Sequence, residues 1–67
     1  MTIEEQRYLE ECRRRLKADQ VEAVEIALNY GIALGNIQAV VKRNLSGAQM
    51  RQIIFAMNEN VEGEALE

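Results

Sequence analysis

The sequence has no histidine, no proline and no tryptophan, and it has a single cysteine, Cys12. A lone cysteine cannot form an internal disulfide, and it fits a reducing compartment. With one thiol and no imidazole, the chain cannot assemble a structural zinc site from the usual nitrogen and sulfur ligands. The lack of histidine also removes the commonest general acid and base of enzymes. We therefore expect no metal, no cofactor and no catalytic activity.

Long apolar runs are absent as well. No stretch approaches the roughly 18 consecutive apolar residues of a membrane-spanning helix, and the acidic start "MTIEEQ" is unlike a signal peptide. The net charge of −3 argues against a general nucleic-acid binder, because such proteins neutralise phosphates with a basic surface. These features predict a cytoplasmic protein that does not contact membranes.

The residues that are present favour an all-α fold. Apolar residues recur at helical spacing, and β-branched residues do not alternate with polar ones. We expect a compact bundle of four short helices. A bundle made of two helical-hairpin repeats is one form that this fold could take. The predicted helices span roughly 2–18, 19–30, 35–43 and 46–60. Residues 1–60 would form a single domain, and 61–67 a frayed acidic tail whose final Leu66-Glu67 is either native or left by cloning.

Polar residues mark three of the predicted helix starts. Thr2 and Glu5 have the spacing of a capping box, in which each side chain accepts a hydrogen bond from the other residue's backbone N–H. Ser46 and Gln49 repeat this spacing. Asp19 is the expected cap of the second helix, since aspartate favours that position.

Two residues are the expected ends of helices, and the apolar residues of the predicted helices define a core. Gly31 and Asn44 can each adopt the left-handed conformation that commonly ends a helix. The predicted helix 19–30 is apolar over most of its circumference, so we expect it at the centre. The predicted core residues are Leu9, Cys12, Leu16, Val21, Val24, Leu28, Ile37, Val40, Val41, Met50, Ile53, Ile54, Met57 and Val61.

Two segments of the chain match each other. "DQVEAVEIALN" and "AQMRQIIFAMN" align at a constant offset of 29 residues, which is the separation of Gln20 and Gln49 (49 − 20 = 29). Ala27 and Ala56 are also identical in this alignment, and Ile26 aligns with Phe55. Any two amphipathic helices agree in their apolar period, so an internal repeat and a chance match are both open interpretations.

The second of these segments resembles a known repeat. "AQMRQIIFAM" is similar to the short "QMxxIRxGL" repeat found in tandem in phage and conjugative-element proteins of Firmicutes. The matching positions are Gln49, Met50, Ile53 and Met57. Ile54 stands where the repeat has arginine, and Ala56 where it has glycine. The resemblance implies helical hairpins and an origin in a phage or mobile element, and it implies no particular activity.

A competing resemblance lies in the middle of the chain. "IALNYGIALGNIQAV" is similar to the helix-turn-helix of phage repressors, with Ala27 and Gly31 at the positions of its small residue and its turn. This resemblance implies a small DNA-binding regulator, in which Gln38, Lys42 and Arg43 would contact DNA. The apolar residues and glycine at 33–35 are poor DNA contacts.

Phe55 does not fit the predicted core. On a helical wheel it lies away from the apolar face of its helix and near Arg51, while Ile26 and Tyr30 lie on a second apolar face of helix 19–30. Aromatic residues concentrate binding energy at interfaces, so we predict a protein interface of Phe55, Ile26, Tyr30 and Arg51. A core this small supplies only about 3–5 kcal/mol, which favours self-association as a source of stability.

The preferred prediction is therefore a non-catalytic interaction module that forms a homodimer or higher oligomer, binds another protein, or does both. The helix-turn-helix regulator is the alternative, and only there would nucleic acid be a partner. A third hypothesis is a phage-type inhibitor of a host protein, because the same surface could bind that protein.

Overall fold

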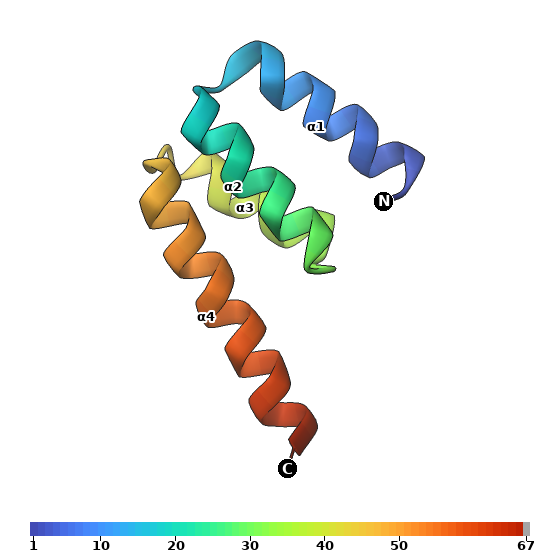
Figure 1. The fold of residues 1–67 in the computed structure, drawn as a ribbon, viewed down its shortest axis with the longest axis vertical. Coiled ribbons are helices and arrows are strands. Elements are labelled where there is room, and N and C mark those ends of the chain that lie inside the picture. The colour runs from blue at the N-terminus through green and yellow to red at the C-terminus, as the bar shows by residue number, and fades with distance from the viewer. Residues whose placement is uncertain (67) are drawn as a thin grey trace.

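The computed structural model describes the backbone of residues 1–66 and the side chains of residues 1–57. Within this range the chain is all α and contains four helices (Figure 1), which confirms the predicted fold class. The helices are α1 (Ile3–Arg15), α2 (Ala18–Asn29), α3 (Leu34–Lys42) and α4 (Gly47–Leu66).

The helix bounds agree with the predicted ones to within a few residues, except at the end of α4. That helix continues to Leu66, where the sequence suggested an end near residue 60. The acidic side chains of the expected tail 61–67, and the whole of Glu67, lie outside the described residues. The domain limit at 60 and the origin of Leu66-Glu67 therefore stay predictions.

Both predicted capping boxes are confirmed. At α1, the Thr2 N–H donates to Glu5 Oε1 at 2.8 Å, and the Glu5 N–H donates to Thr2 Oγ1 at 3.1 Å. At α4, the Ser46 N–H donates to Gln49 Oε1 at 3.1 Å, and the Gln49 N–H donates to Ser46 Oγ at 3.2 Å. Each pair satisfies backbone N–H groups that have no partner within the first turn of a helix.

The two predicted helix ends are confirmed too. Gly31 follows α2 with φ of 80°, and Asn44 follows α3 with φ of 56°. Most residues with a Cβ seldom adopt this conformation. Glycine has no Cβ, and asparagine tolerates the conformation because its short polar side chain can form local hydrogen bonds.

Helix α2 lies at the centre of the fold and packs against each of the other three helices, as its apolar circumference predicted. Its Ala23, Val24 and Ala27 have no exposed surface. The full core consists of Leu9, Cys12, Ala23, Val24, Ala27, Leu28, Ile37, Val40, Met50 and Ile54. Five predicted core residues are only half-buried and pack around it, namely Leu16, Val21, Val41, Ile53 and Met57. The side chain of Val61 lies outside the described residues.

The cap of α2 is not Asp19, contrary to the prediction. The N-cap is Lys17, whose backbone N–H donates to Gln20 Oε1 at 3.0 Å. Asp19 lies inside the first turn, and its Oδ2 accepts a hydrogen bond from the Gly47 N–H at 2.8 Å. It therefore caps α4 from a different helix, and this backbone hydrogen bond lowers the pKa of the Asp19 carboxyl.

The first turn of α2 also holds the loop before α4. Gln20 Nε2 donates to the Leu45 carbonyl oxygen at 2.8 Å. Gln20 and Gln49 thus occupy equivalent places, because each accepts the N–H of the residue three positions earlier. The two aligned alanines differ, however, since Ala27 is fully buried and Ala56 is exposed. The shared helix starts are consistent with a repeat, and the two-repeat organisation stays a prediction.

At Gly47 the backbone of α4 lies very close to the backbone of α2, and this contact yields a testable prediction. A Cβ at Gly47 would lie 2.4 Å from the Asp19 carbonyl oxygen, which belongs to the backbone and cannot turn aside. We expect Gly47→Ala to lower the free energy of unfolding by about 1–3 kcal/mol, as overpacked sites do. Urea unfolding followed by circular dichroism measures this change.

Gly35 in α3 supplies the matched control for this substitution. A Cβ at Gly35 would meet no atom within 4 Å. Because alanine favours helix more than glycine does, Gly35→Ala is expected to be neutral or to stabilise the domain by up to about 1 kcal/mol. Equal losses in the two variants would contradict the close approach of α4 to α2.

Candidate interaction surface

Helices α2 and α4 run side by side in the same direction, as the labelled ribbons show (Figure 1). Two side-chain contacts join their outer edges. The rings of Tyr30 and Phe55 have centroids 5.6 Å apart and are tilted by 57°. Arg51 Nη1 lies 3.8 Å from Glu22 Oε1. We call the surface formed by Glu22, Ile26, Tyr30, Arg51 and Phe55 the α2–α4 surface.

Of the four predicted interface residues, Tyr30 and Phe55 contact each other, and Ile26 and Arg51 each lie one helical turn before one of them. Ile26 lies one helical turn after Glu22 and one turn before Tyr30, so the three form a single row on α2. Arg51 and Phe55 are likewise one turn apart on α4. The prediction named residues from two separate helices, and the packing of α2 against α4 brings them together.

The aromatic pair remains largely open to solvent. Tyr30 is 51% exposed and Phe55 is 41% exposed, while Ile26 is half-buried. In the part of the chain with described side chains, the other large exposed apolar residues are Met1 and Ile3, at the start of α1. Phe55 is thus off the core, as predicted, but its ring is not isolated, because Tyr30 contacts it.

Sequence reasoning missed Glu22 as a member of this surface. The signal was present, because Glu22 aligns with Arg51 in the internal match and carries the opposite charge. Helices α2 and α4 run in parallel from starts that lie close together, and the aligned residues Glu22 and Arg51 come within ion-pair distance. The Glu22–Arg51 pair is solvated, with side chains 65% and 41% exposed, so it adds at most about 1 kcal/mol.

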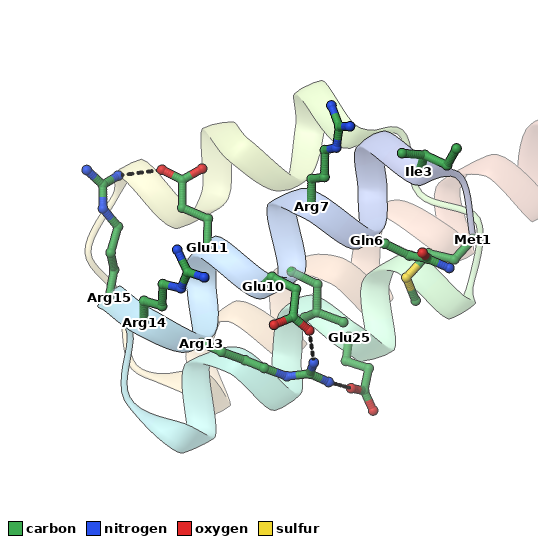
Figure 2. A pocket seen from close by; sticks show the side chains of 11 residues that line it. Met1, Ile3, Gln6, Arg7, Glu10, Glu11, Arg13, Arg14, Arg15 and Glu25 are labelled. Carbon is green, nitrogen blue, oxygen red and sulfur yellow. Dashed lines mark hydrogen bonds and ion pairs between the residues drawn. The ribbon is translucent and has the colours of Figure 1, made fainter.

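The outer side of α1 forms a wide, open hollow lined mostly by charged side chains (Figure 2). Arg13, one of the lining residues, forms ion pairs with Glu10 on its own helix and with Glu25 of α2, the latter at 3.2 Å. Arg13 therefore ties α1 to α2. The charges of this hollow largely neutralise one another, which is typical of a solvated surface.

Helix α1 carries a second ion pair between its own residues. Glu11 and Arg15 are in contact at 3.0 Å, one helical turn apart (Figure 2). Glu10 pairs with Arg13, which also reaches Glu25 of α2.

The residues proposed to contact DNA lie on the outside of α3 and just after it. Gln38 and Lys42 are exposed and one turn apart, and Arg43 is exposed at the end of the helix. Leu34 differs from the helix-turn-helix expectation, because it is half-buried and packs against the core. Ala33 and Gly35 are exposed but offer no polar side chain, so Gln38, Lys42 and Arg43 are the residues of this region that could bind a nucleic acid through polar contacts.

The single thiol is not positioned for chemistry. Cys12 is 4% exposed, and its burial raises the pKa of the thiol, which lowers the fraction of reactive thiolate at neutral pH. Among the side chains of residues 1–57, no group of three or more cysteine, aspartate or glutamate residues is arranged to hold a metal ion.

No helix in the described part of the chain combines the length and the apolar composition that crossing a membrane requires. No family model matches the sequence, and neither the curated proteins nor the solved structures contain a significant match.

Proposed function

We propose that this protein is a non-catalytic interaction module that self-associates through the α2–α4 surface. The observation that carries the proposal is the exposed contact between Tyr30 and Phe55. Aromatic residues with open faces are the side chains that most often dominate binding energy at protein interfaces. A cytoplasmic location and an origin in a phage or mobile element belong to the proposal, and they rest on the sequence features described above.

The arrangement of polarity on this surface supports the proposal. Tyr30 and Phe55 contact each other, the half-buried Ile26 lies one helical turn before Tyr30, and the Glu22–Arg51 ion pair lies one turn before Ile26 and Phe55. Interfaces are commonly built in this way, with an apolar centre from which water is excluded and a polar rim. Burial of the aromatic rings would also add stability to a domain whose own core is small.

Sedimentation of the purified chain tests this proposal. At tens of micromolar we expect a dimer or a larger species, because burial of the aromatic pair stabilises the associated state. Dilution should dissociate it by mass action. If only particles of 7.6 kDa are present at about 100 micromolar, self-association is excluded as the function of this surface.

A second candidate function is DNA binding by α2 and α3. The observation in its favour is that Gln38, Lys42 and Arg43 are exposed, while Ala27 is buried and Gly31 makes the turn. Glutamine and lysine on one helix face are suitable for contacts with base edges and phosphates.

Titration of labelled duplex DNA at physiological salt distinguishes the two candidates. For an interaction module we expect weak binding without sequence preference. Specific binding tighter than about 1 micromolar, lost in Gln38→Ala, would favour the regulator. Ala39→Gln is a control at an exposed neighbouring position on α3, and it should leave any specific binding in place.

A further inference from the structure

We infer that the associating partner is a second copy of this chain, docked with two-fold symmetry so that the two α4 helices run antiparallel and Phe55 lies next to the axis. The inference rests on the proposed self-association and adds its geometry. It is carried by the outer side of α4 and by the distribution of charge along that helix.

The outer side of α4 has the shape that a second helix needs. Ala48, Gln52 and Ala56 are exposed and recur at one-turn intervals, and Phe55 lies beside them. The distance between packed helices depends on the side chains at their contact, and alanine allows a close approach. A second helix on this side of α4 would therefore cover the open face of Phe55.

The charges along α4 are complementary to themselves when the helix is reversed. Arg51 is the only charged residue of α4 before Phe55, and it lies one turn from it. After Met57 the sequence contains four glutamates and no lysine or arginine. In an antiparallel pair, Arg51 of each copy lies beside the acidic half of the other helix. A parallel pair would place like charges together, which disfavours association.

Two-fold symmetry doubles the number of attractive charge pairs in the interface. An isologous interface uses the same patch on both copies, so each contact occurs once in each direction. Arg51 is available for such a contact, because its side chain is 41% exposed and its only ion pair among the described residues is the long one to Glu22. The partner that this charge pattern fits is consequently another copy of the same helix.

The test uses two charge reversals on either side of Phe55, Arg51→Glu and Glu59→Arg. Position 59 follows Phe55 by one turn along the helix. Each variant alone would place two like-charged pairs across the antiparallel interface. In an equimolar mixture, a heterodimer of the two variants would restore two attractive pairs. We expect the mixture to associate about tenfold more tightly than either variant alone, measured by sedimentation.

The mixture separates effects across the interface from effects within one chain. Arg51→Glu also faces Glu22 of its own chain, but that repulsion is the same whether or not the second variant is present. Arg14→Glu on α1 makes the same charge change on an exposed residue away from α4. Alone it should associate as the wild type does, and its mixture with Glu59→Arg should associate no more tightly than Arg14→Glu alone.

The outcomes distinguish this geometry from the proposed function. Tighter association of the mixture supports the antiparallel pair. If the wild type self-associates and the mixture gains nothing, the antiparallel geometry is wrong and self-association stands. If the wild type stays monomeric, both the antiparallel geometry and the proposed self-association are wrong.

Discussion

Replacement of Met50 by alanine is expected to lower the free energy of unfolding by about 2–5 kcal/mol, the usual cost of removing a large buried side chain. Met50 is only 1% exposed and lies in the core beside α2. A domain of this size has only about 3–5 kcal/mol from its core, so the variant should be largely unfolded at room temperature. Circular dichroism and urea unfolding measure the loss.

Two other substitutions on or next to α4 calibrate this result. Ser46→Ala removes the capping hydrogen bond to the Gln49 N–H and should cost about 0.5–2 kcal/mol. Gln52→Ala changes an exposed residue and should stay within about 0.5 kcal/mol of the wild type. If Met50→Ala is as stable as Gln52→Ala, Met50 does not belong to the core and the assigned face of α4 is wrong.

Phe55→Glu is expected to weaken self-association by about thirtyfold or more, the loss typical of a residue that dominates an interface. A carboxylate at this position would have to lose its water within an apolar contact, and that costs free energy without a compensating partner. Sedimentation over a range of concentrations measures the change. Ala39→Glu places the same charge on an exposed residue of α3 and should leave association unchanged.

Phe55→Glu has a smaller effect on the free energy of unfolding of the monomer. Phe55 contacts Tyr30, so its loss should cost the monomer about 0.5–1.5 kcal/mol, more than an isolated surface residue would. Stability must be compared below the concentration at which the wild type associates, because loss of a dimer lowers apparent stability by mass action. A variant that is unfolded at every dilution would place Phe55 in the core and remove it from the proposed interface.

The local structure at the helix ends could be predicted from the sequence. The bonds between Thr2 and Glu5 and between Ser46 and Gln49 join residues three positions apart, so residue type and spacing are sufficient to predict them. Gly31 was predictable for a similar reason, since its backbone conformation excludes most other residues. The central place of α2 followed from its apolar circumference.

The role of Asp19 could not be predicted in this way. Aspartate is a good cap for its own helix, and the sequence around it offers no reason to look elsewhere. Its partner is the Gly47 N–H, which belongs to a helix that begins many residues later. Which of two nearby residues caps a helix depends on where the chain turns, and here that turn comes one position before α2, at Lys17.

The candidate interface depends partly on the sequence and partly on the tertiary structure. The sequence by itself determined that Phe55 and Tyr30 are apolar and lie off the faces of their helices that form the core. Only the tertiary structure decided that the two rings touch, because a helical wheel treats each helix alone. Their contact depends on α2 and α4 packing in parallel, and that packing depends on the close approach of Gly47, which has no side chain, to the Asp19 backbone.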